Sequence, residues 1–448
     1  MKFTIRILLF FSITALAACA AETVRPTVHS DVVTVPVETE VAEIYAIDPA
    51  IEGSMPAHLV EASVRIAILL PLSGDKKDLG KALLGAASMA LFDAYDPRIT
   101  LIPFDTKASA EGAAEAAVAA LEANVDLVLG PLFSESIMVV GPLLAKKNIT
   151  MIGFSSDRRV AGLGQFIMGF APEDEVNRVM AYAVKQGHNN FAALIPKGLY
   201  GQRVLKTIGN TLEVNKARLM AMEEYPPSAD SVFEPIKKLA DYTARKGMRD
   251  AELLAMKAID SDVGLDIIKD LQDKEVLGDV NFSAILIPEG GQLLRTIAPL
   301  LPYYEVDPVK VQFLGTGLWN DSSVLREPPL EGAWFAAPEP EKPAEFMRKY
   351  EAIYGEAPPR IATLAYDAMA LVALRMRHPI NEERYSTAAL LDMRGFQGID
   401  GLFRFKEDGT VERSLAILEI TKKGFVVIEK APHTFPRFGA YVIRPVEK

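Results

Sequence analysis

The residue types that most often carry out catalysis are present, but their spacing forms no catalytic or metal-binding motif. Five histidines are scattered along the chain, and none has a second histidine or a cysteine at zinc-site spacing. No Gly-x-Ser-x-Gly, Ser-x-x-Lys or Gly-x-x-x-x-Gly-Lys motif occurs, and Gly162-x-Gly164 and Gly315-x-Gly317 lack the third glycine of a dinucleotide site. We therefore predict a protein that is not an enzyme and needs no cofactor or metal. Because carboxylates are plentiful, a glycosidase site with a pair of acidic residues is the alternative.

The chain has one cysteine, Cys19, which cannot form an intramolecular disulfide and so needs another explanation. It follows a start that carries Lys2 and Arg6, and then an apolar stretch, Ile7–Ala15, that is too short for a permanent transmembrane helix. These features predict a secretory signal over residues 1–18.

The segment Leu16-Ala17-Ala18-Cys19 resembles the lipobox of bacterial lipoproteins. That resemblance implies cleavage before Cys19, a diacylglycerol thioether on its sulfur and a further acyl chain such as palmitate. More than one acyl chain is what stable anchoring requires. The next residue is Ala20 rather than aspartate, which in Gram-negative lipoproteins implies sorting to the outer membrane, facing the periplasm. The alternative is an ordinary secreted protein whose signal happens to end in cysteine.

Residues 19–62 have the composition of a disordered tether. From Ala20 to Ala62 there are four prolines, eight acidic residues and one arginine, and no sustained apolar period. A random coil of this length spans roughly 35 to 40 Å on average. A short edge strand over Val32–Val37 is the alternative.

Composition excludes several classes of protein. The net charge is −11 and no block is rich in lysine and arginine, which argues against nucleic acid and against an electrostatic hold on anionic lipid. Half of the residues are apolar, enough for two or three domains with substantial cores. After the signal no stretch approaches 18 uncharged apolar residues.

The segment after the tether alternates short apolar runs with amphipathic helices. Asp78–Ala94 places Leu79 and Leu83 on one face, and Ala108–Ala123 is rich in alanine. Continuous apolar strands alternating with helices predict an α/β fold with doubly wound, mainly parallel sheets. The predicted strands are Val64–Leu70, Ile99–Phe104, Val125–Leu129, Ile149–Phe154, Phe191–Ile195, Phe282–Ile287 and Val311–Leu314, with a final group at Leu402–Phe405, Ser414–Thr421 and Phe425–Glu429.

Several fragments, in order along the chain, resemble the type I periplasmic binding proteins. They are Ile66–Gly74, Val128–Ser134, Ile149–Asp157, Tyr200-Gly201, Tyr366-Asp367-Ala368 and Phe396–Gly401. The resemblance covers residues 64 to about 432 and implies two lobes joined by several crossovers. We expect lobe 1 to comprise residues 63–171 and 337–395, lobe 2 residues 172–336 and 396–432, with a charged helical insertion at 226–279 and a C-terminal tail at 433–448.

Ligands of open α/β sheets bind beyond the carboxyl ends of the strands, so the loops at those ends are the candidate cleft. Ser134 and Ser156 are suited to an anionic group, Glu289 to an ammonium, and Tyr200 and Trp319 to an apolar body. The alternative for each serine is a helix N-cap, and for Glu289 a solvated loop charge. The complete candidate set is Ser73, Leu132, Phe133, Ser134, Ser155, Ser156, Tyr200, Glu289 and Trp319.

Within that superfamily, the lipobox, tether, Gly-Pro-Leu-Phe-Ser segment and charged insertion resemble the penicillin-binding protein activators. The resemblance implies an outer-membrane lipoprotein that stimulates a peptidoglycan synthase by direct contact, although the helical-repeat N-domain of the best-known members is absent. The partner would be a bifunctional penicillin-binding protein, which would contact either the insertion or the rim of the cleft. Binding of a small ligand in the cleft is a further possibility that the sequence leaves open. The alternatives are a solute-binding lipoprotein of a branched-chain amino acid ABC transporter and a purely structural wall-binding lipoprotein.

Overall fold

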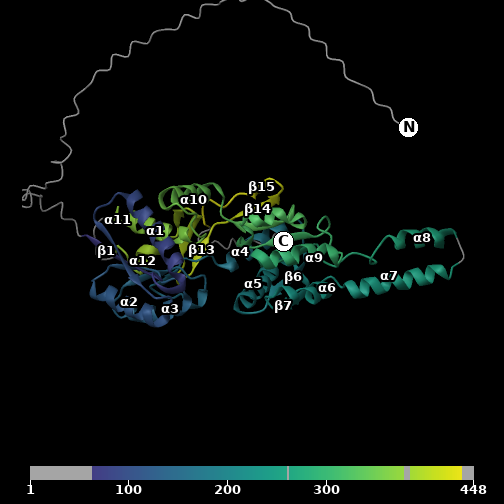
Figure 1. Ribbon diagram of the computed structural model, residues 1–448, viewed down its shortest axis with the longest axis horizontal. Coiled ribbons are helices and arrows are strands. Elements are labelled where there is room, and N and C mark those ends of the chain that lie inside the picture. The colour runs from purple at the N-terminus through teal and green to yellow at the C-terminus, as the bar shows by residue number, and fades with distance from the viewer. Residues whose placement is uncertain (1–62, 260–261, 378–383, 436–448) are drawn as a thin grey trace, which may run out of the picture. The chain divides into compact units, whose positions relative to one another are not determined.

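The computed structural model describes residues 63–259, 262–377 and 384–435. The predicted signal, lipidated Cys19, the tether and its alternative strand Val32–Val37 lie outside these residues, as does most of the predicted tail. The described chain alternates strands and helices and builds two large sheets with helices on their faces, together with a small three-stranded sheet (Figure 1).

The first sheet is parallel throughout, in the order β2-β1-β3-β4-β5. Its strands are β1 (Val64–Leu70), β2 (Ile99–Asp105), β3 (Leu127–Leu129), β4 (Thr150–Gly153) and β5 (Gln165–Ile167). The helices of this first lobe are α1 (Lys77–Ala94), α2 (Ala110–Glu122), α3 (Ser134–Ala145), α10 (Glu341–Tyr354), α11 (Ala362–Met376) and α12 (Thr387–Leu390).

The composition of β1 explains why this sheet is covered on both faces. Successive side chains of a strand point to opposite faces. Ile66 and Ile68 are buried in a cluster with α1 and α11, whereas Ala67 and Leu69 are buried with α2 and α3. A strand buried on both faces has no polar alternation, which is why continuous apolar runs predicted β1 correctly.

The second sheet has the order β15-β14-β10-β9-β8-β6-β7 and is parallel except where β14 pairs with β10 and β15. Its strands are β6 (Asn190–Pro196), β7 (Arg218–Tyr225), β8 (Ala284–Leu286), β9 (Gln312–Gly315), β10 (Trp334–Ala337), β14 (Ala416–Thr421) and β15 (Gly424–Glu429). The helices of this second lobe are α4 (Pro172–Lys185), α5 (Leu199–Asn215), α6 (Phe233–Leu239), α7 (Tyr242–Lys257), α8 (Asp262–Gln272) and α9 (Gly291–Tyr303).

The last part of the chain differs from the prediction. A separate antiparallel sheet is formed by β11 (Phe396–Gly398), β12 (Gly401–Phe405) and β13 (Val411–Arg413), so β12 pairs with β11 and β13 rather than with β14, which covers the predicted strand Ser414–Thr421. Phe396, Phe403 and Phe405 are buried in the core of the first lobe, although we had assigned residues 396–432 to the second. Within this last part of the chain, the residues join the core of the second lobe only from about residue 415 onward. Alternation identifies a strand but not the sheet it joins, which explains the wrong boundary.

Within the described residues, no helix combines the length and the apolar character needed to cross a bilayer.

Candidate functional site

The predicted ligand loops of the first lobe lie at the carboxyl ends of its strands, and most of their residues already have structural roles. Ser73 is exposed, and its backbone N–H donates to Asp105 Oδ1 at 3.3 Å. Leu132 is buried in the core, Phe133 is half-buried at the N-cap position of α3, and Ser134 is the first residue of that helix. Phe133, rather than Ser134, therefore occupies the N-cap position, and no side chain caps this helix.

Ser155 and Ser156 follow β4, and both are engaged by the protein itself. The Oγ of Ser155 accepts a hydrogen bond from the backbone N–H of Asp157 at 3.1 Å. The carbonyl oxygen of Ser156 accepts one from Nη2 of Arg203 at 2.7 Å. Arg203 lies in α5 of the second lobe, so this bond joins the two lobes.

The start of α4 supplies the acidic partners of this junction. Pro172 occupies the first helical turn, followed by Glu173, Asp174 and Glu175, as expected at the positive end of a helix dipole. Arg203 makes a bidentate pair with Glu173, with distances of 2.8 and 2.7 Å. Burial opposes ionisation of Glu173, but the hydrogen bond and charge of Arg203 hold its pKa below the ordinary value. The arginine therefore keeps this carboxylate ionised.

Asp174 is paired from the other side of the junction. Nη2 of Arg158, in the loop after β4, lies 2.6 Å from Oδ1 of Asp174 and donates to it. Burial nevertheless raises the pKa of Asp174, because the desolvation cost outweighs the charge of Arg158. Two arginine–carboxylate pairs thus hold the beginning of α4 against both lobes. We define this interlobe junction as Ser156, Arg158, Glu173, Asp174 and Arg203.

Glu175 lies one residue further and faces the turn after β9 in the second lobe. Its Oε2 accepts a hydrogen bond from the backbone N–H of Gly317 at 3.0 Å. A Cβ at position 317 would lie 2.4 Å from Oε1 of Glu175, so a side chain there would displace this carboxylate. Glu175 retains some exposed area but is surrounded by protein, and burial raises its pKa to about 7. A carboxyl that titrates near neutrality is a marker of functional sites.

Two hydroxyl groups near Glu175 are left without a partner. Tyr200 and Thr316 lie close together, but the geometry falls short of a hydrogen bond and neither buried oxygen has another protein partner. Burial raises the pKa of Tyr200, and the charges of Glu175 and Glu289 raise it further, so this phenol is neutral. Buried polar groups without partners are costly unless a ligand or water completes them.

Glu289 and Trp319 are joined by a hydrogen bond in the second lobe. Oε2 of Glu289 accepts a hydrogen bond from the hydroxyl of Tyr225 at 2.7 Å, and its carbonyl oxygen accepts one from the indole N–H of Trp319 at 2.9 Å. Trp319 is completely buried. Our prediction that it covers a ligand is wrong, because its ring packs against Gly315 in the core instead. Tyr200 and Glu289 remain candidates.

The arrangement offers polar groups to which a ligand could bind. Glu175, Tyr200 and Thr316 offer an ionisable carboxyl and two free hydroxyls beside the interlobe junction. In the described part of the chain no three histidine, cysteine, aspartate or glutamate side chains are placed to hold a metal ion. The sequence prediction missed Glu175, Arg203 and Thr316, and two of them, Glu175 and Arg203, lie inside helices rather than in the loops at the strand ends. The only signal was the run of three acids after Pro172.

A second candidate surface is formed by α7 and α8, which lie side by side as a helical hairpin (Figure 1). Its base is fixed by Arg245, whose buried guanidinium donates to the carbonyl oxygens of Ala240, Gly278 and Glu305. Large apolar side chains on the rest of the hairpin are exposed; these are Met248, Leu254, Ile259, Val263 and Leu265. An anchored element that presents apolar side chains to solvent has the character of a docking surface.

Comparisons with known proteins agree with this architecture. Residues 63–424 match a family model described as periplasmic binding protein. Over 192 residues the chain is 27% identical to an uncharacterized protein of Rickettsia prowazekii, and this match covers 42% of the chain and 51% of the relative. Over 143 residues it is 28% identical to the penicillin-binding protein activator LpoA of Photobacterium profundum, covering 31% of the chain and 23% of the relative. The matches thus span about half, or less, of these curated relatives.

A solved structure has the same fold. It is that of a putative branched-chain amino acid ABC transporter from Rhodospirillum rubrum, which superimposes with a TM-score of 0.63 at 19% identity. The superposition covers 82% of this chain and all of that one. At this level of identity the likeness concerns the fold.

Proposed function

Because the chain belongs to the periplasmic binding protein family, we propose that it acts by binding, as a lipoprotein that activates a peptidoglycan synthase through direct contact. The exposed apolar side chains of the α7–α8 hairpin carry this proposal. The partial match to LpoA, whose name describes an activator of a penicillin-binding protein, supports the choice of partner.

The hairpin has the features of a protein-binding surface. Leu254, Val263 and Leu265 are 73%, 68% and 64% exposed, so each leaves apolar area that a partner would remove from water. Their helices are held at the base by Arg245 but have little contact with the sheets. Such a surface can dock on a synthase without any change in the lobes.

The N-terminal sequence supports the cellular location that the proposal requires. Acylation of Cys19 would anchor the chain to the outer membrane, and the acidic tether would present the lobes toward the cell wall. Replacing Ala20 with aspartate should retain the protein in the inner membrane if the sorting proposal is correct. Recovery of this variant in the outer membrane would refute the sorting proposal.

The test of function is glycan polymerisation by a bifunctional penicillin-binding protein with and without this protein. We expect stimulation by the wild-type chain and its loss in the double variant Leu254→Asp, Leu265→Asp. Binding should weaken more than tenfold, since apolar anchors dominate such interfaces. The matched control places aspartate at Val214 and Val309, which are 81% and 91% exposed on other elements, and should stimulate like the wild type.

A solute-binding role is the second candidate, and the free hydroxyls of Tyr200 and Thr316 beside Glu175 favour it. The likeness to a putative branched-chain amino acid ABC transporter agrees with this role. Micromolar binding of a branched-chain amino acid, together with no stimulation of the synthase, would replace our proposal. Sedimentation with peptidoglycan sacculi without any effect on synthesis would indicate a purely structural wall-binding protein.

A further inference from the structure

A pocket in the first lobe lies away from both surfaces described above. It has a volume of about 440 Å³ and lies at the amino ends of β4 and β5, whereas the candidate ligand loops follow the carboxyl ends of the strands. Because the strands are parallel, the two regions are at opposite ends of the sheet. The lining residues are Gly141, Leu144, Ala145, Asn148, Ile149, Thr150, Met151, Leu163, Gly164, Gln165, Ser386, Thr387 and Ala388.

Among the residues that the structure describes, no charged side chain belongs to this lining. A charged ligand would lose its hydration here without gaining a counter-charge, which is costly. The pocket also takes in the C-terminal end of α3, where the helix dipole is negative and disfavours an anion. An uncharged ligand is therefore favoured.

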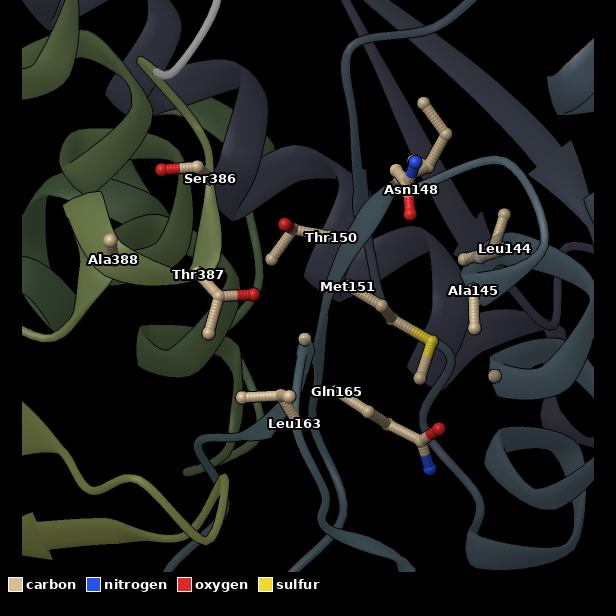
Figure 2. A pocket seen from close by; sticks show the side chains of 13 residues that line it. Leu144, Ala145, Asn148, Thr150, Met151, Leu163, Gln165, Ser386, Thr387 and Ala388 are labelled. Carbon is tan, nitrogen blue, oxygen red and sulfur yellow. The ribbon is translucent and has the colours of Figure 1, made fainter.

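The polar groups of the lining are hydroxyls and amides. Figure 2 shows the hydroxyl groups of Thr150 and Thr387 facing each other across the pocket, with the amide of Gln165 on the side away from Thr387. These groups both donate and accept hydrogen bonds. A ligand that satisfies them must itself carry several hydroxyl or amide groups.

The amide of Gln165 is held in place. Its Nε2 donates to the carbonyl oxygen of Val160, and its Oε1 lies so close to Gly141 that a Cβ at that position would begin 1.8 Å away. The glycine in the middle of α3 therefore makes room for this amide. Side chains fixed before binding lose little entropy when a ligand arrives.

Apolar groups complete the pocket. Met151 is buried beneath it, and Leu163 stands at its edge with 81% of its area exposed. Leu163 offers an apolar contact to a ligand face or a methyl group. The ligand that suits this lining is uncharged, is rich in hydroxyl groups and carries an amide and a methyl group. An N-acetylated sugar has this chemistry.

We propose that this pocket binds an N-acetylated, uncharged saccharide. The choice of an acetamido sugar over other neutral sugars rests partly on the proposed role in cell-wall synthesis, where such sugars form the glycan. The pocket would then give the protein a contact with glycan that is separate from its contact with a synthase.

Calorimetric titration of the full chain with N,N′-diacetylchitobiose tests the proposal, with maltose as the sugar that lacks acetamido groups. We expect saturable binding of chitobiose and at least tenfold weaker binding of maltose. Equal affinity for both sugars, or no saturable binding of chitobiose, would overturn it.

Substitutions of lining residues test whether the sugar binds in this pocket. Thr387→Val removes one hydroxyl at constant shape and should weaken binding about fivefold. Ala145→Trp fills the pocket from an exposed position and should abolish binding, while Thr296→Val on α9 should leave it unchanged. Undiminished binding by Ala145→Trp, with its fold verified by circular dichroism, would refute this location. No synthase is present in this assay, so its outcome is independent of the polymerisation test.

Discussion

Arg203 of the second lobe donates a hydrogen bond of 2.7 Å to the carbonyl oxygen of Ser156 in the first. The same guanidinium makes a bidentate pair with Glu173, at the start of the helix that follows the first crossover between the lobes. One side chain thus joins a loop of one sheet to a helix packed on the other. Its planar fork of donors suits this task, which a lysine could not perform in the same geometry.

Replacing Arg203 with methionine should loosen the interlobe junction. The variant keeps the apolar stem but loses charge-assisted hydrogen bonds, and we expect the free energy of unfolding to fall by about 2 kcal/mol at pH 7. Because the folded-state pKa of Glu173 is lowered, this contribution is present above the carboxyl's ordinary pKa and is lost as pH falls through the folded value. Urea titrations of both proteins at pH 7 and pH 3.5 measure the change. An equal loss at both values would show that charge plays no part.

The contribution of Glu175 to the pH dependence of stability has the opposite sign. Its folded pKa of about 7 lies above the ordinary value of 4.5, so the folded state holds a proton that the unfolded state releases between these values. Stability should therefore fall as pH rises from about 4.5 to 7. Glu175→Gln keeps the acceptor for Gly317 and removes the titration, so it should stabilise the protein by up to about 3 kcal/mol at pH 8 and by under about 1 kcal/mol at pH 5. A constant difference from pH 5 to pH 8 would contradict the assignment.

The sequence predicted the strands that are buried on both faces better than the others. β1 was predicted at its observed bounds, and β4, β6 and β9 within one residue at each end, because their apolar runs are nearly continuous. β7, with Arg218, Glu223 and Glu224, was missed because it lies at the sheet edge and three of its eight side chains are charged. β5 has three residues and too little pattern to detect.

The candidate site was predicted less well, for a physical reason. The rule that ligands lie beyond strand ends located the loops of Ser156, Tyr200 and Glu289, but it does not tell which polar groups the protein itself satisfies. Trp319 was misjudged because its loop position suggested exposure, whereas its indole N–H has a buried partner in the carbonyl of Glu289. Contacts between residues far apart in sequence, such as that of Glu175 with Gly317, leave no local pattern.

A buried charge cluster where the crossovers meet gives a further prediction. Asp400 is fully buried and accepts hydrogen bonds of 2.5 Å from Arg360 and 2.6 Å from Thr363. Asp400→Asn leaves arginine charge without compensation and should lower the free energy of unfolding by about 3 kcal/mol or more.

Asp367 provides the matched control for Asp400. Burial and the negative charge of Asp400 raise the pKa of Asp367, and one of its oxygens has no hydrogen-bond partner. Asp367→Asn should therefore change stability by under about 1 kcal/mol at neutral pH. Calorimetric unfolding of the two variants side by side checks this, and equal losses would mean that both carboxylates are ionised.

The base of the α7–α8 hairpin connects stability to the proposed function. Arg245 is buried and binds three carbonyl oxygens, and its own carbonyl accepts a hydrogen bond from the backbone N–H of Leu277 at 3.0 Å. Arg245→Met leaves these acceptors without donors, so we expect the hairpin to open locally while the second sheet stays folded. Hydrogen exchange should then accelerate in α7 and α8 but not in β6, β8 or β9. Stimulation of the synthase should fall although Leu254 and Leu265 are intact, because exposed apolar side chains bind well only when their helices are held in place. Full stimulation by a variant whose hairpin exchanges freely would place the docking surface elsewhere on the chain.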